Sequence, residues 1–230
     1  MDPASLPALP GLLSQPRLTP YLTSCAGDQG QAVRLYTWNI AAASAFWGPV
    51  HALEVVLRNA EHTQLVTRFG QDDWWSNPRV QLHKSMADQL QQAILAGGKT
   101  AVRQSRVMIA DDVVANLSFG FWSGLAGKGQ GGAQYETQFW QPALNKAFPG
   151  YTGRRGPLHS QLESLRLFRN RIAHHEPIFG RHLAADHATI LRVAGYLAPD
   201  ADAYIAGHSR VPAVLAARPA AVTTGQGSAF

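Results

Sequence analysis

The sequence predicts an all-α protein of 230 residues. Apolar residues recur at the steps of three and four that are typical of amphipathic helices, and alternating stretches flanked by turns, which would indicate strands, are not evident. Hydrophobic residues make up 46% of the chain, which is ample for a buried core. Charged residues make up only 15%, below the roughly 25% typical of soluble domains, which favours a surface partly buried by a partner.

Five segments carry the helical period. Their apolar or small positions are Leu53, Val56, Leu57, Ala60 and Leu65 in the first, Met86, Leu90, Ala93 and Ile94 in the second, Val113, Leu117 and Phe121 in the third, and Leu158, Leu162, Leu165, Phe168 and Ile172 in the fourth. The fifth runs from about Ala185 to Leu197 and ends before Pro199. We expect Gly97-Gly98 to end the second helix as a C-cap.

Local composition predicts the boundaries of one helical domain. Residues 1–30 are rich in proline at their start, and we expect them to be partly irregular. Residues 31–217 form the predicted domain, interrupted by a glycine-rich loop at 124–132. Residues 218–230 combine proline, glycine, threonine and serine and are predicted to be disordered.

Charge and cysteine content exclude several classes of protein. The chain carries a net charge of +5, has a pI near 9.7 and uses arginine more than lysine. This charge is compatible with a nucleic-acid partner, but charge alone favours a mildly basic protein that has none. Cys25 is the single cysteine, so the chain forms neither an internal disulfide nor a zinc-finger site. No uninterrupted apolar run reaches about 18 residues and no signal-peptide pattern is evident, so we expect a cytoplasmic protein without membrane contact.

Two glycine motifs resemble nucleotide-binding loops without their context. Residues 127–132 match G-x-G-x-x-G, but a helical pattern precedes them and the acidic residue expected about 20 positions later is missing. Gly98-Lys99-Thr100 resembles the end of a P-loop, but Ala93 stands where the first glycine of that motif belongs. We interpret both as loop or cap residues.

The chemically informative segment lies at the end of the fourth helix, where arginines, an asparagine and two adjacent histidines follow one another over residues 166–176. Pro177 disfavours helical dihedrals at the residue before it, so the helix is expected to end near His175. Both histidines then occupy the last turn, where the helix dipole favours a protonated imidazole. A histidine beside arginines supplies the proton transfer and the cation that cleavage of an RNA phosphodiester requires.

Helical geometry restricts how these side chains can cooperate. Asn170 shares a face with His174, and Arg171 shares one with His175, because each pair is four residues apart. Arg169 and His174 are five apart and diverge by about 140° on an ideal helix. Two copies facing each other could pool the arginine of one and the histidine of the other, which predicts a homodimer.

Two other interpretations of the segment remain open. Adjacent histidines beside Glu176 are often helix caps with a nearby ion pair, and spacing alone slightly favours this interpretation. His174, His175 and Glu176 could also be metal ligands, but neighbouring helical residues point about 100° apart and no H-E-x-x-H spacing is present. We therefore expect neither a metal nor another cofactor.

The segment 169–174 resembles the R-x(4–6)-H motif of HEPN domains, and the chain is similar to their Abi-like branch (abortive-infection proteins related to AbiD and AbiF). Four ordered blocks carry the resemblance over about residues 32–218: 36–39 with 53–59, 114–122, 169–178 and 209–212. The R-x(4–6)-H pattern alone is loose, and the ordered blocks are much more specific.

The resemblance implies an all-α, HEPN-like helical bundle that is usually dimeric. It also implies a metal-independent endoribonuclease of bacterial antiphage defence, acting in abortive infection or as a toxin. Arg169 matches the motif arginine, Asn170 the polar residue that commonly follows it and His174 the motif histidine. His175 also fits the permitted spacing, so either histidine could act.

Five further residues are candidates for a supporting role. Glu54 and Arg58 lie four apart on the first helix beside Asn59, and we expect them to orient the side chains of the 169–175 segment, although an exposed ion pair is the alternative. Arg171 and Glu176 flank the histidines and are expected to support them.

The competing hypothesis is a HEPN module that binds RNA or a partner protein without cutting. A further possibility is a toxin restrained by an antitoxin or another regulatory partner. The six tryptophans, including Trp47, are expected to pack in the core, with Trp74-Trp75 the pair closest to the surface.

Overall fold

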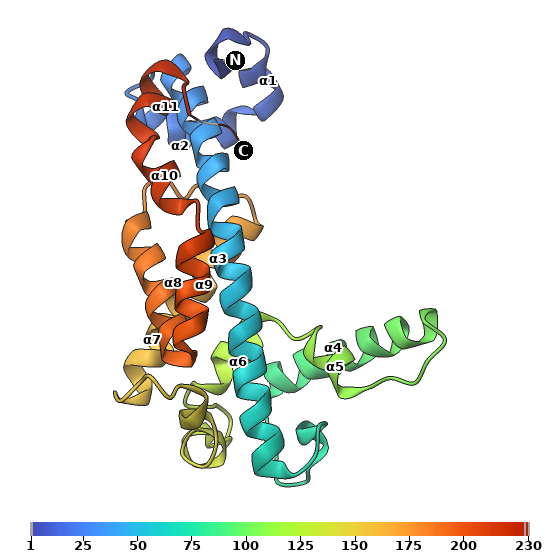
Figure 1. The fold of residues 1–230 in the computed structure, drawn as a ribbon. Coiled ribbons are helices and arrows are strands. Elements are labelled where there is room, and N and C mark those ends of the chain that lie inside the picture. Colours follow the sequence, from blue (N-terminus) through green and yellow to red (C-terminus); the bar gives the residue numbers. More distant parts are fainter. Residues whose placement is uncertain (1, 228, 230) are drawn as a thin grey trace. The chain divides into compact units, whose positions relative to one another are not determined.

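The computed structural model describes residues 2–227 and 229, and within them all regular structure is helical, without a strand. The protein is thus all-α, as predicted (Figure 1). The elements are η1 Pro3–Ser5, α1 Leu9–Leu13, α2 Gln15–Ser24, α3 Gln29–Phe69, η2 Trp74–Ser76, α4 Lys84–Arg103, α5 Ala110–Val114, α6 Phe119–Leu125, η3 Glu136–Trp140, η4 Leu144–Ala147, α7 Arg155–Ala173, α8 Leu183–Leu197, α9 Pro199–His208, α10 Val211–Ala216 and α11 Arg218–Thr224.

Contacts within the chain divide it into two compact units, where the sequence predicted one domain. The first unit comprises Met1–His51, Phe168–Leu191 and Tyr204–Phe230. The second comprises Ala52–Leu167 and Arg192–Ala203. Helices α3, α7, α8 and α9 each contribute residues to both units.

The core of the first unit is built around Trp38 on α3, which is fully buried. Its indole Nε1 donates a 2.9 Å hydrogen bond to the carbonyl of Val214, and the Arg218 guanidinium lies 4.7 Å from the ring centroid. Both partners belong to the C-terminal helices α10 and α11, which therefore pack on the first half of α3 (Figure 1). The cation–π contact gives Arg218 a structural role at the start of the segment expected to be disordered.

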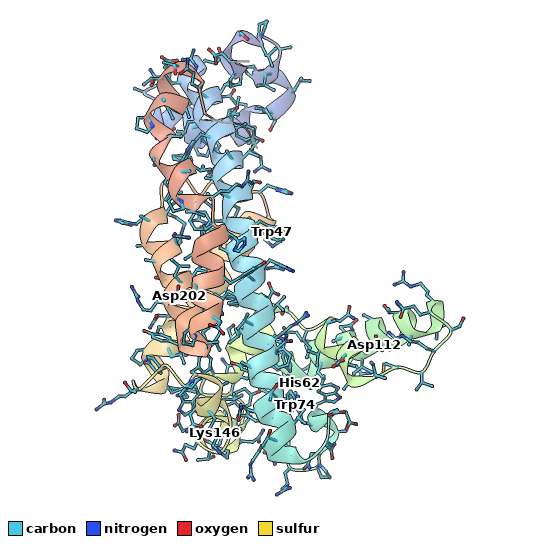
Figure 2. All side chains as sticks on the ribbon, viewed as in Figure 1. Trp47, His62, Trp74, Asp112, Lys146 and Asp202 are labelled. Carbon is cyan, nitrogen blue, oxygen red and sulfur yellow. The ribbon has the colours of Figure 1, made fainter. Side chains whose placement is uncertain are left out.

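The second unit has an aromatic core centred on Trp74, which is also fully buried. Its ring meets Phe139 edge to face at 6.1 Å, and its Nε1 donates a 3.2 Å hydrogen bond to Nδ1 of His62 (Figure 2). Burial lowers the pKa of His62, which favours the neutral imidazole whose Nδ1 accepts this hydrogen bond. Trp74 therefore packs in the core, as expected of each tryptophan, and Trp75, the other member of the pair expected closest to the surface, is half-buried.

Helix α4 does not end at Gly97-Gly98 but continues to Arg103, so the predicted C-cap is wrong. Gly97 is buried against α5, where an added Cβ would lie 3.1 Å from backbone atoms of Asp112. The glycine thus serves close packing between two helices. The same continuity places Gly98-Lys99-Thr100 in the interior of a helix, which confirms that they form no phosphate loop.

The two ends of the chain are more regular than the sequence suggested. Proline lies in the first turn of η1, α1, α2, α10 and α11, where its missing N–H costs no helical hydrogen bond. Residues Arg218–Thr224 of the expected disordered tail form α11. Met1, Ser228 and Phe230, which fall in the predicted terminal segments, lie outside the described residues.

Helix α3 passes a test of length and hydropathy for a membrane span that no other described helix passes. The mean hydropathy of its most apolar 18-residue window is 1.5, and 44% of that window is buried inside the protein. The core helix of a soluble protein has the same length and hydropathy.

The buried face of α3 also carries a carboxyl group, that of Glu61, between Leu57 and Leu65. Glu61 is fully buried, and neither side-chain oxygen has a hydrogen-bond partner among the described residues. Burial raises the pKa of Glu61 well above its usual value, which favours the protonated, neutral carboxyl.

Substitution of the two adjacent glycines in α4 tests the close approach of α5. We expect Gly98→Ala to raise the free energy of unfolding by about 0.5–1 kcal/mol, because alanine is the better helix former. The added methyl group would fit without a clash, since the atom nearest to it is Met108 Sδ at 3.9 Å. Gly97→Ala should instead lower it by about 1 kcal/mol or more, because the methyl group would press on the backbone of Asp112. Urea denaturation compares the two, and equal effects would contradict the packing described for Gly97.

Candidate functional site

The candidate site lies where helix α7 ends in the first unit. The helix ends at Ala173, and His174 and His175 form the turn that follows it. The expectation that both histidines occupy the last helical turn is therefore wrong. The His175 N–H bonds the Ile172 carbonyl at 3.0 Å, and the Glu176 N–H bonds the carbonyl of Arg171 at 2.8 Å. This pair of hydrogen bonds is the Schellman motif that closes many helices.

His175 occupies the position of this motif at which glycine is usual. Its φ is +56°, in the left-handed region that side chains with a Cβ rarely adopt. Such a residue costs about 1–2 kcal/mol relative to a right-handed conformation. Strained residues of this kind cluster at functional sites, so the conformation of His175 marks the turn as a candidate.

Three groups hold the turn in place. Arg171 Nε and a carboxylate oxygen of Glu176 form an ion pair at 3.0 Å across the turn, and Arg17 of α2 donates a 2.5 Å hydrogen bond to the His175 carbonyl. The imidazoles of His174 and His175 are both exposed, and neither makes a hydrogen bond within the described part of the chain. The backbone is therefore fixed while both rings are available to a ligand.

Asn39 on α3 anchors the chain immediately after the turn. Its side chain is buried, and its Oδ1 accepts hydrogen bonds from the backbone N–H groups of Ile178 at 2.8 Å and Phe179 at 3.1 Å. Sequence reasoning assigned no role to Asn39. The signal was present, because an amide next to Trp38 in a buried helical stripe requires a partner.

Arg169 projects from α7 one turn before the histidines. Its guanidinium carbon lies 5.6 Å from the ring centroid of Trp47, a cation–π contact between α7 and α3. Trp47 is 45% exposed, so its predicted burial in the core is wrong (Figure 2). The predictions for Trp38, Trp122 and Trp140 are confirmed, since all three are buried.

The supporting residues divide between the units. Glu54, Arg58 and Asn59 belong to the second unit, whereas residues 169–176 belong to the first. Glu54 accepts a 3.0 Å hydrogen bond from the Phe119 N–H, so it caps the first turn of α6. The expected orienting action of Glu54 and Arg58 on the 169–175 segment stays a prediction.

Hydrogen bonds join two pairs of the sequence segments that carry the resemblance. In the first unit, Asn39 connects segment 36–39 to segment 169–178. Ser209 of the last segment bonds Nε2 of His187, which lies outside these segments, at 2.9 Å. Burial lowers the pKa of His187. In the second unit, Glu54 connects block 53–59 to block 114–122.

Replacing His175 by glycine measures the strain at the turn. We expect His175→Gly to raise the free energy of unfolding by about 0.5–1 kcal/mol, because glycine adopts positive φ without steric cost. His174→Gly is the matched control, since its backbone N–H keeps a helical bond to Asn170 at 2.9 Å and the change should be destabilising. A loss of stability in His175→Gly would show that the ring itself supports the fold.

No protein-family model, curated protein or solved structure matches this chain. Among the described residues, no group of three His, Cys, Asp or Glu side chains could hold a metal ion.

Proposed function

We propose that this protein is a metal-independent endoribonuclease of the HEPN, Abi-like type that acts in the cytoplasm in bacterial antiphage defence. The observation that carries the proposal is the turn after α7, whose backbone is fixed by hydrogen bonds to other helices. It presents the exposed imidazoles of His174 and His175 one turn from Arg169, and its backbone is held by Arg17 and Asn39. Fixed backbone beneath unpaired imidazoles suits proton transfer, because imidazole exchanges protons near neutral pH.

The proposed reaction needs only the RNA and these side chains. One imidazole takes the proton of the ribose 2′-hydroxyl as the 2′-oxygen bonds to phosphorus, and a second, protonated imidazole gives its proton to the departing 5′-oxygen as the bond between that oxygen and phosphorus breaks. Arg169 stabilises the charge on the pentacoordinate phosphate, and Asn170 holds the histidine or a phosphate oxygen. The products are a 2′,3′-cyclic phosphate and a 5′-hydroxyl.

The backbone of the turn supports a dimeric site. The His174 N–H still bonds the Asn170 carbonyl at 2.9 Å, so helical spacing extends to His174. Arg169 and His174 of one chain therefore diverge by about 140° and are poorly placed around one phosphate. In a homodimer, the arginine of one copy can serve the histidine of the other. His175 leaves the helical path, because its φ is positive.

A second function is favoured by a different observation. Trp47 is exposed beside Arg169, and an aromatic ring next to a guanidinium is suited to stacking a base of single-stranded RNA. This arrangement supports a HEPN module that binds RNA, or a partner protein, without cutting it. A restraining antitoxin is compatible with both functions.

Incubation with total RNA in excess EDTA tests the proposed function. Wild type should cut the RNA and leave 2′,3′-cyclic phosphate ends, whereas His174→Ala should reduce the rate by about 10²–10⁴-fold through loss of proton transfer. Arg169→Ala should reduce it by about 10²–10³-fold through loss of charge stabilisation. His175→Ala measures the part played by the second imidazole.

The matched control is His208→Ala, which removes an exposed histidine on α9 and should leave the rate unchanged. Cleavage of DNA as readily as RNA would contradict the mechanism, because DNA lacks the 2′-hydroxyl. Absence of cleavage by all versions, with each folded and dimeric, would favour the binding module.

A further inference from the structure

The loop between α4 and α5 exposes three consecutive apolar side chains. Val107, Met108 and Ile109 are 84%, 39% and 54% exposed. Exposed runs of apolar residues lower the solubility of a protein, and they are typical of surfaces that contact a partner. The loop belongs to the second unit and is separate from the α7 turn in the chain.

The loop is held rigidly by Arg106. Its two terminal nitrogens bond the two carboxylate oxygens of Asp112 at 2.6 and 2.5 Å, and Nη1 also bonds the Val107 carbonyl at 3.1 Å. Asp112 in turn accepts the Ile109 N–H at 3.0 Å, and the Arg106 guanidinium with this N–H lowers the pKa of Asp112 to about 2. The apolar side chains are thus presented by a fixed backbone.

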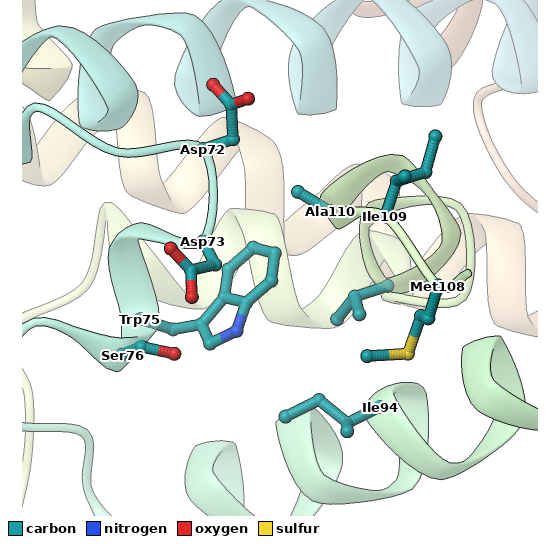
Figure 3. Close-up of a pocket in the computed structure, with 9 residues that line it drawn as sticks. Asp72, Asp73, Trp75, Ser76, Ile94, Met108, Ile109 and Ala110 are labelled. Carbon is teal, nitrogen blue, oxygen red and sulfur yellow. The ribbon is translucent and has the colours of Figure 1, made fainter.

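This loop forms one wall of a cavity of about 540 Å³ (Figure 3). The opposite wall carries the indole of Trp75 with Asp72 and Asp73, and Ile94 of α4 lies at the base of the view. A volume in this range, a mainly apolar lining and a few polar groups are typical of binding sites.

The charge of the cavity is opposite to that of the chain. Its nine lining residues include the carboxylates of Asp72 and Asp73 and no basic residue, although the chain as a whole carries +5. The face of an indole attracts cations, and the attraction adds to that of nearby carboxylates. The site therefore favours a positively charged group that is flanked by apolar surface.

We propose that this cavity and the adjoining Val107–Ile109 loop bind a segment of a partner protein in which apolar side chains alternate with arginine or lysine. The apolar side chains would cover Met108 and Ile109, and the basic side chain would lie between Trp75 and the two aspartates. An anionic membrane is a poorer fit, because Asp72 and Asp73 would be repelled from its surface.

The three methionines of the chain provide a local readout. In protein labelled with ¹³C-methyl methionine, Met108 reports on the cavity wall and the buried Met86 serves as internal control, with Met108→Leu assigning the signal. The probe is a short capped peptide of alternating leucine and arginine. We expect it to shift the Met108 signal saturably and to leave Met86 unmoved.

Matched probes and variants test each part of the proposal. A peptide with glutamate in place of arginine, or serine in place of leucine, should bind at least about tenfold more weakly. The double variant Asp72→Asn with Asp73→Asn, and separately Trp75→Ala, should weaken the leucine–arginine peptide by about fivefold or more. Leu95→Ser, which changes an exposed apolar residue outside the cavity, should leave its binding unchanged.

Four outcomes would overturn the proposal. The Met108 signal could fail to move at millimolar peptide, or could move equally with the glutamate peptide. It could shift with protein concentration alone, which would indicate a second copy of the chain as the occupant. It could also respond to anionic phosphatidylserine vesicles more strongly than to the peptide, which would indicate a lipid surface.

Discussion

The hydrogen bonds from Ile178 and Phe179 to Asn39 are the interaction on which the candidate site depends. They join the backbone to a side chain that lies 139 residues before Ile178 and 140 before Phe179, and they satisfy a buried amide oxygen that would otherwise destabilise the core. Because Asn39 lies beside Trp38, which bonds the carbonyl of Val214, α3 fixes both the chain after α7 and the C-terminal helices. The position of the α7 turn is therefore set by the core of the first unit.

The backbone of the α7 turn is held by polar contacts, and it also includes a residue with a strained, positive φ. Arg17 bonds the carbonyl of His175, and the Arg171–Glu176 ion pair closes the turn from its exposed side. Glycine would remove the steric cost of the positive φ at position 175, so the histidine found there lowers the stability of the fold. This combination is what the proposed ribonuclease requires, since the rings must be exposed while their backbone stays fixed.

The helical period placed α7 and α8 close to their observed bounds. It missed the first half of α3, which begins at Gln29, and it joined α5 and α6 into one helix. The helical period gave wrong predictions where packing between helices determines the end of a helix or the burial of a side chain. The break expected at Gly97 is absent because α5 packs against that glycine, and the apolar period does not distinguish the exposed Trp47 from the buried Trp38. In the site, the order Arg169, Asn170, His174 was readable from the sequence. The place of Asn39 beside Trp38 indicated that its amide needs a partner, but the identity of that partner was not readable, because Ile178 and Phe179 reach Asn39 only across the fold.

In the proposed ribonuclease, two copies of the α7 turn form the site from Arg169 of one chain and His174 of the other. Mixing the inactive variants Arg169→Ala and His174→Ala tests it most directly. Half of the randomly reassorted dimers are mixed and each regains one of two sites, so we predict recovery of about a quarter of wild-type RNA cleavage. No recovery, with mixed dimers demonstrated by mass spectrometry, would contradict the shared site.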